Sequence, residues 1–219
     1  MSDIFNEVDE DVRRDKAAEF WKKYQNVIIG AAVLLVIATA AWRFYQNREL
    51  AAAQRAGAAF QQALAFDHDG KGADADAALA KLAADAPAGY QTLARLARAG
   101  IAAKTDPKGA IGLYDALAAD AAIGAPFQEA ARLRAAMLRL DAGETDAAKS
   151  ALQGLADSAG VYRNTARLGL AVIALNANDY DDAGKSLDLV AADPDAPITE
   201  KRSAESLLGL VAANRPATK

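Results

Sequence analysis

The chain has 219 residues, a formal net charge of −4 and no cysteine. Without cysteine it has no disulfide, thiolate metal site or cysteine nucleophile, and its interspersed charges show no basic patch of the kind that binds nucleic acid. Alanine is the most abundant residue and strand-forming residues are scarce, so the composition predicts an all-α protein with closely packed helices.

The first predicted element is an uncharged apolar stretch over residues 24–42, between Lys23 and Arg43. As a helix it spans roughly 28 Å, close to the thickness of a bilayer hydrocarbon core. It shows no recurring polar face, which argues against a buried helix of a soluble protein. We therefore predict a transmembrane anchor over residues 24–45, with interface side chains at both ends: Trp21, Tyr24, Trp42, Arg43, Phe44 and Tyr45.

A cleaved signal peptide is the alternative, since Ala38-Thr39-Ala40 has the form of a cleavage site. However, the segment before the stretch is rich in acidic side chains, whereas the start of a signal peptide is short and basic. Five basic residues precede the span and three follow it closely, a bias that favours a cytoplasmic N-terminus. The expected layout at a bacterial inner membrane is a cytoplasmic tail (1–23), a single-pass anchor (24–45) and a periplasmic domain (46–219).

A repeated pattern follows the anchor. The triplet Ala-Arg-Leu occurs at 94–96, 131–133 and 166–168, and each copy opens a first helix with apolar residues that include Met137 and Val172. A second helix lies between copies, with apolar residues at i, i+4 and i+7 and offsets of 38 and 35 residues. One helix pair cannot bury such stripes alone, so neighbouring pairs must stack. The second-helix stripes are Ala75, Leu79, Leu82; Ala110, Tyr114, Leu117; Ala148, Leu152, Leu155; and Ala183, Leu187, Val190.

Helix stops and capping residues divide this region further. Turns at 105–109, 143–146 and 176–182 separate first from second helices, and prolines mark boundaries between pairs. The predicted helices are 43–66, 74–86, 89–104, 108–120, 126–142, 145–158, 161–177, 180–192 and 199–214, the last being a solitary cap.

Two of these turns resemble the turn within a tetratricopeptide repeat. They read Asn178-Asp179-Tyr180-Asp181-Asp182-Ala183 and Gly143-Glu144-Thr145-Asp146-Ala147-Ala148. The period differs from the roughly 34 residues of that repeat, and its usual first-helix tryptophan is absent. The resemblance therefore implies a solenoid of divergent tetratricopeptide-like helical hairpins.

The layout of the whole chain is similar to one family in particular. An acidic tail, a span that ends in Trp42-Arg43-Phe44-Tyr45, and an alanine-rich repeat domain resemble the YfgM-like ancillary subunits of the Sec translocon. This resemblance implies an accessory or chaperone-like subunit beside the Sec translocon channel and a periplasmic folding factor, which assists exported unfolded chains. A structural adaptor of the cell-envelope or cell-division machinery is the alternative, because it needs the same tethered repeat domain.

Residues typical of catalysis are scarce. His68 is the only histidine, and it lies in a predicted connector that lacks the calcium-loop pattern. The sequence contains no nucleophile elbow and no glycine-rich phosphate loop. We expect no enzyme activity, no cofactor, no metal site and no small-molecule substrate, so the expected partners are the membrane and other proteins.

Arginines on the first helices are the candidate binding residues. In stacked helical hairpins the first helices line a concave surface, where guanidinium groups can bind carboxylates or peptide backbone. The alternative is that these arginines are solvated flanks of amphipathic helices and pair with nearby acids. The candidate groove residues are Arg95, Arg132, Arg134 and Arg167.

Overall fold

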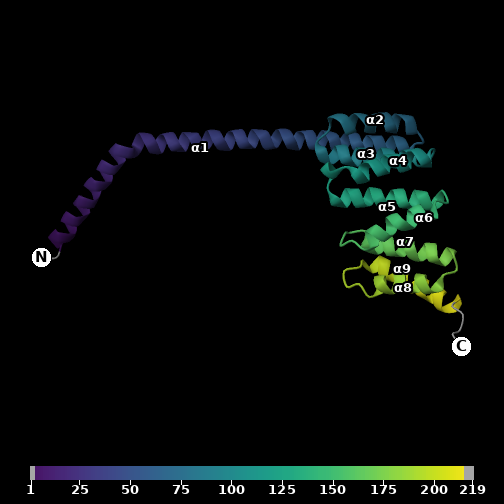
Figure 1. The fold of residues 1–219 in the computed structure, drawn as a ribbon. Helices are drawn as coiled ribbons and strands as arrows, with labels where there is room; N and C mark the ends of the chain where they lie inside the picture. The colour runs from purple at the N-terminus through teal and green to yellow at the C-terminus, as the bar shows by residue number, and fades with distance from the viewer. Residues whose placement is uncertain (1–2, 215–219) are drawn as a thin grey trace. The chain divides into compact units, whose positions relative to one another are not determined.

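The computed structural model describes the backbone of residues 3–214 and the side chains of residues 18–27 and 29–214. Over this range the chain forms nine α-helices and one short 3-10 helix, with no strand (Figure 1). The prediction of an all-α protein is confirmed. The elements are α1 (Asp3–His68), α2 (Gly72–Asp85), α3 (Ala88–Ala102), α4 (Pro107–Ala119), η1 (Ala121–Ile123), α5 (Ala125–Asp141), α6 (Thr145–Ala156), α7 (Arg163–Asn176), α8 (Tyr180–Ala191) and α9 (Ile198–Asn214).

The contacts within the chain divide it into two units, residues 1–54 and residues 55–219, and α1 contributes to both. The sequence predicted a helix over 43–66 separate from the anchor, whereas α1 continues through both as one helix. The reason is that residues 46–56 are mostly good helix formers, without proline or glycine. The domain boundary at residue 46 stays a prediction. Of the predicted tail (1–23), the side chains at positions 1–17 lie outside the described part.

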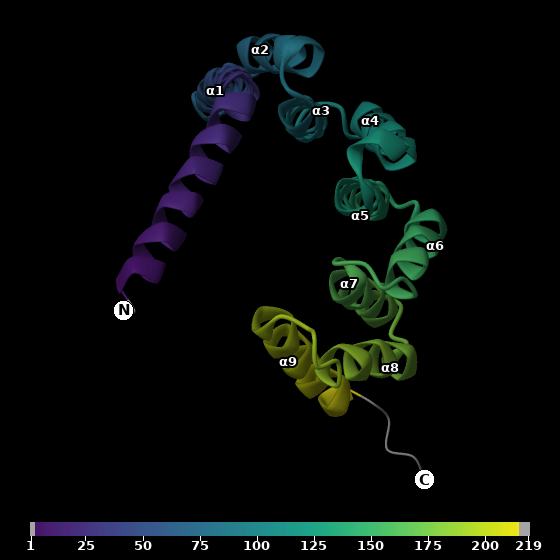
Figure 2. The same ribbon diagram turned by 90° about the vertical axis from the view of Figure 1, so that its left-hand side faces the viewer.

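Residues 55–214 form a stack of helical hairpins. The last turns of α1 pack with α2 and α3, further hairpins are formed by α3–α4, α5–α6 and α7–α8, and α9 covers the last of them. In Figure 2 these helices follow an arc, with α3, α5, α7 and α9 along its inner side and α2, α4, α6 and α8 along its outer side. The predicted hairpin solenoid, with its solitary last helix, is confirmed.

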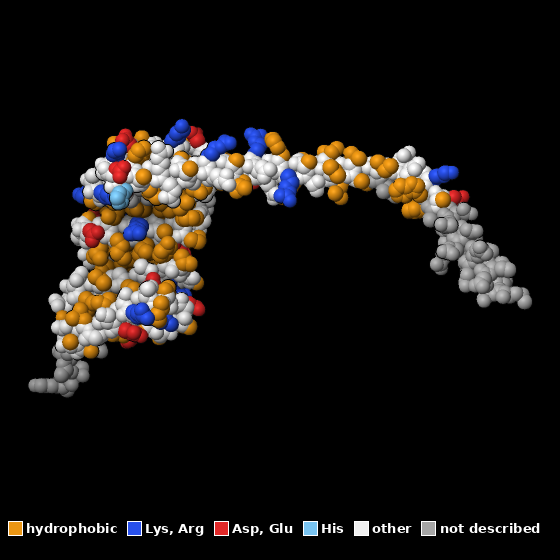
Figure 3. Space-filling view, turned by 180° about the vertical axis from the view of Figure 1, so that it is seen from behind, with side chains coloured by type: hydrophobic (Ala, Val, Ile, Leu, Met, Phe, Trp, Pro, Cys, Tyr) orange, Lys and Arg blue, Asp and Glu red, His pale blue; other side chains and the backbone are white. Residues whose placement is uncertain are grey.

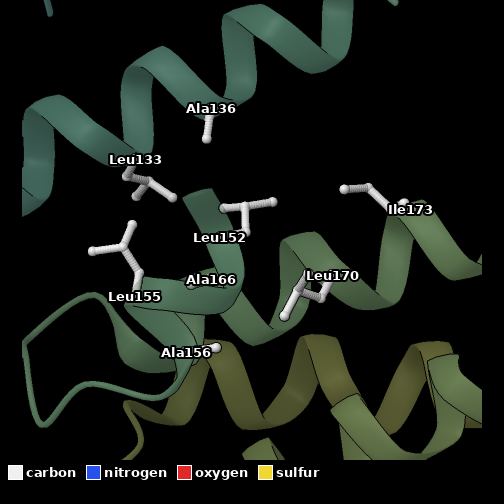
Figure 4. Packing of buried hydrophobic residues seen from close by; sticks show 8 residues of the cluster. All are labelled: Leu133, Ala136, Leu152, Leu155, Ala156, Ala166, Leu170 and Ile173. Carbon is white, nitrogen blue, oxygen red and sulfur yellow. The ribbon is translucent and has the colours of Figure 1, made fainter. Parts of the chain in front are cut away.

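The second-helix stripes form the core of this stack. Every predicted stripe residue of α2, α4, α6 and α8 is at most 8% exposed. In α6, Leu152 lies between the neighbouring first helices, where it packs with Leu133 and Ala136 of α5 and with Leu170 and Ile173 of α7 (Figure 4). Burying a side chain of this size stabilises the fold by about 1.5–3 kcal/mol. The second helices α4, α6 and α8 thus pack both against the first helix of their own pair and against the helix that follows.

The turns within the hairpins stop one helix and start the next. Gly143 and Asn178, at equivalent places in successive repeats, directly follow the C-caps of α5 and α7 and have positive φ angles of 80° and 58°. Glycine and asparagine adopt this left-handed conformation more readily than other residues. Asp106 and Asp179 cap α4 and α8, since each side chain accepts a 3.0 Å hydrogen bond from the backbone N–H three residues later. Helix stops and caps therefore recur where the turn pattern predicted them.

Candidate binding groove

The inner side of the hairpin stack carries a mainly apolar groove with a volume of about 930 Å³. Its walls come from α3, α5 and the start of α7, with one side chain each from α1 and α4. Figure 3 views this side and shows hydrophobic side chains gathered across its middle. We call it the inner groove; its larger lining residues are Phe60, Leu93, Leu96, Tyr114, Leu133, Arg134, Met137, Leu138, Asp141, Tyr162 and Thr165.

Equivalent positions of successive repeats build this groove. Leu96 and Leu133 are the leucines of the Ala-Arg-Leu triplets in α3 and α5, and Met137 lies one turn further along α5. Val172 is the same position in α7, and it is 39% exposed although it belongs to the apolar pattern of that helix. In the described part of the chain no further helix layer covers the inner side of the stack.

Two charged side chains, Arg134 and Asp141, lie among these apolar walls. Both are exposed, and neither forms an ion pair with any side chain that the structure describes. Elsewhere on α5 the situation differs, since Arg139 donates two hydrogen bonds, of 3.1 and 2.5 Å, to Asp115. Burial raises the pKa of the Tyr114 phenol, and the nearby positive charge of Arg134 opposes this shift. The groove therefore combines apolar walls with one unpaired cation and one unpaired anion.

Arg134 is the one predicted groove arginine found among the lining residues. Arg95 donates a 2.6 Å hydrogen bond to Asp120, directly after α4, and Arg167 makes a 3.3 Å contact with Asp193, after α8. Arg132, at the equivalent place in α5, is exposed and forms no ion pair with a described side chain. The contacts of Arg95 and Arg167 therefore match the alternative interpretation, in which these arginines lie at the flanks of amphipathic helices and pair with nearby acids. Ligand binding by any of the four stays a prediction.

A buried polar network joins α7 to the connection between α8 and α9. The carboxylate of Asp193 accepts hydrogen bonds from Asn164 at 3.0 Å, from Arg163 at 2.6 Å and from the backbone N–H of Asp195 at 3.0 Å. These bonds, that from Asn164 foremost, lower the pKa of Asp193 to about 2. The network fixes the connection between α8 and α9 against α7, and none of its residues lines the groove.

A second candidate surface is the apolar part of α1, which is long and apolar enough to cross a membrane. None of its described side chains in the first unit is buried within the chain, as contact with lipid requires. Arg48 lies 5.9 Å from the ring centre of Phe44, so basic and aromatic side chains adjoin at the end of the apolar stretch. The remaining predicted interface residues, Trp21, Tyr24, Trp42, Arg43 and Tyr45, are also exposed. Membrane crossing and its direction stay predictions.

Residues of the kind that bind metal are dispersed. Within the described part of the chain no three His, Asp or Glu side chains come together as metal ligands. His68 ends α1, and its exposed ring lies 3.9 Å from the carboxylate of Asp69. The two candidate binding surfaces are thus the inner groove, which is apolar and carries two charges, and the exposed apolar part of α1.

Comparison with protein families matches residues 18–154 to a family model described as a tetratricopeptide repeat-like domain. The match covers more than half of the chain, from the apolar part of α1 into α6. A search of curated proteins finds no match. The structure extends the repeat beyond the matched range, since α7 and α8 form another hairpin with the same buried stripe.

Proposed function

Because the chain belongs to the tetratricopeptide repeat-like family, we propose that its inner groove binds segments of other proteins. The observation that carries this proposal is the apolar groove of α3, α5 and α7 with its unpaired Arg134 and Asp141. Stacked helical hairpins generate extended concave surfaces, and repeat proteins use such surfaces to bind partners. Apolar walls supply the affinity, and the two charges restrict which segments fit.

We further infer that α1 tethers this groove to a bacterial inner membrane, with the N-terminus in the cytoplasm and the repeat domain in the periplasm. The exposed apolar segment and the excess of basic residues before it support this arrangement. A tether of this kind raises the local concentration of a partner at the same membrane to about the millimolar range. A groove of modest affinity is then sufficient to bind such a partner.

The most specific form of the proposal is an accessory or chaperone-like subunit of the Sec translocon. Its partners are then the translocon channel, a periplasmic folding factor and exported unfolded chains, all of which are present at that membrane. The order of acidic tail, anchor with its Trp42-Arg43-Phe44-Tyr45 cluster, and alanine-rich repeats supports this form.

The test is crosslinking in cells, followed by purification of the full chain in mild detergent and identification of its partners by mass spectrometry. Leu93→Glu puts a charge into the groove wall and is expected to lose the partners. Leu189→Glu is the matched control, because Leu189 is an exposed leucine of α8 outside the groove.

The proposal is supported if Leu93→Glu loses translocon subunits and exported chains as partners and Leu189→Glu keeps them. Loss of cell-division or wall-synthesis proteins instead selects the envelope adaptor. If Leu93→Glu keeps every partner of the wild type, the groove is not the binding surface.

A further inference from the structure

The walls of the inner groove offer few hydrogen-bonding groups to a ligand. The side chains of Leu93, Leu96, Leu133 and Met137 dominate it, and the backbone amides behind them are bonded within α3 and α5. An extended segment buried here leaves much of its own backbone N–H and C=O unpaired, which is costly. A helical segment pairs its backbone internally and presents side chains alone. The apolar walls therefore favour a helical ligand over an extended one.

The two unpaired charges set a spacing for that ligand. Arg134 and Asp141 are seven residues apart on one face of α5, which places them about 10.5 Å apart along the helix axis. A ligand that covers the groove removes both groups from water, so it must offer an opposite charge to each. On a ligand helix beside α5, the matching residues are again seven positions apart.

We infer that the preferred occupant of the inner groove is an amphipathic helix of the partner protein, with one acidic and one basic residue two turns apart at its apolar face. The acidic residue faces Arg134 and the basic residue faces Asp141. This inference rests on the proposed function, whose groove it uses, and it names the class of ligand. Arg95 and Arg139 do not line the groove and have acidic partners within the chain, so they add little to the selection of a ligand.

Designed peptides test the charge pattern. The full chain is placed in nanodiscs, and binding of fluorescent helical probes is measured by anisotropy, with empty nanodiscs as background. The 18-residue probes share a leucine face and differ in two face positions seven residues apart, which carry Glu and Lys, two Glu, or two Lys. The wild type is expected to bind the mixed probe about five- to tenfold more tightly than either like-charged probe.

Charge reversal of the groove is expected to change this preference. Arg134→Glu should prefer the probe with two Lys, and Asp141→Lys the probe with two Glu. Lys149→Glu is the control on the neighbouring helix α6, because Lys149 is exposed but does not line the groove, and it should keep the wild-type preference. A ranking of probes that the two groove variants leave unchanged overturns the charge pattern, as does absence of binding to every probe.

A proline in the middle of the mixed probe tests the helical form. Proline breaks a helix but leaves an extended segment intact, so binding is expected to fall at least tenfold. Equal binding of the two probes overturns the helical inference. The two probe experiments test the class of ligand. The proposed function is tested separately, and it fails if Leu93→Glu keeps all the cellular partners of the wild type.

Discussion

The carboxylate of Asp193 is shared by several donors at the end of the hairpin stack, among them Asn164 and Arg163. Asp193→Asn keeps the size of this side chain but leaves Arg163 and Arg167 without their counter-charge. We expect the variant to lower the thermal unfolding midpoint by several degrees at pH 7, measured by circular dichroism of the full chain in detergent. Asp188→Asn, an exposed position of α8 without a described partner, should leave the midpoint unchanged.

The same carboxylate predicts a pH dependence. Its pKa is about 2 in the folded protein and about 4 in an unfolded chain, so its charged form stabilises the fold. This stabilisation is fully present above about pH 4 and is lost as the pH falls towards about 2. The difference in midpoint between wild type and Asp193→Asn should shrink over this interval. A difference of constant size would contradict the assignment.

The left-handed residues after α5 and α7 allow a paired comparison. Gly143→Ala forces a Cβ into the positive-φ region and should lower the free energy of unfolding by about 1 kcal/mol. Asn178→Gly, at the equivalent turn, relieves the same restriction and should leave stability unchanged or slightly higher. Urea unfolding followed by circular dichroism measures both. Equal stability of Gly143→Ala and wild type would mean that the turn rearranges freely.

At the scale of a helix, each second helix stabilises two neighbours. Leu152→Ala removes a fully buried side chain from between α5 and α7 and should lower the free energy of unfolding by about 2–5 kcal/mol. Leu189→Ala is its control, since that leucine of α8 is 55% exposed. Hydrogen exchange with mass spectrometry should show faster exchange in α5, α6 and α7 for the first variant alone. Faster exchange confined to α6 would argue against joint packing.

The helices could be predicted closely because their stripes and turns depend on local spacing. Leucine and alanine at i, i+4 and i+7 define a buried face wherever the helix lies, and the buried stripes confirm this. The 3-10 turn η1 was not predicted, since its start depends on the Asp120 side chain, which accepts a hydrogen bond from Ala122. The sequence pattern also did not predict that the anchor and the helix over 43–66 form one continuous helix, α1.

The groove was harder to predict than the helices. Arg95 aligns with Arg132 in the Ala-Arg-Leu triplets, whereas Arg134 lies two residues further along α5 and therefore on another face of its helix. Whether such an arginine pairs depends on an acid beyond the next helix, as in the contact between Arg95 and Asp120. Alignment of repeats hints at the inner positions, since Met137 and Val172 correspond. Their incomplete burial follows from the curvature of the stack, which spacing within one helix does not encode.

At the scale of the whole molecule, topology is the property on which the proposed location depends. We expect a reporter fused after Lys219 to be active only in its exported form, because basic residues are more numerous before the span than after it. Protease added to spheroplasts should digest the repeat domain and spare the tail. A C-terminus in the cytoplasm would exclude the proposed periplasmic partners while leaving the groove itself unaffected.

Most of the main packing contacts of the repeat domain join helices that are neighbours in the chain, and the pair α7 and α9 is separated by one helix. Contacts of this short range are made early and need little loop closure, so such a chain folds fast. A domain delivered gradually, N-terminal part first, can therefore order each hairpin as soon as the next helix arrives to cover it. The α7–α8 hairpin depends in the same way on α9, which covers Leu187 and Val190.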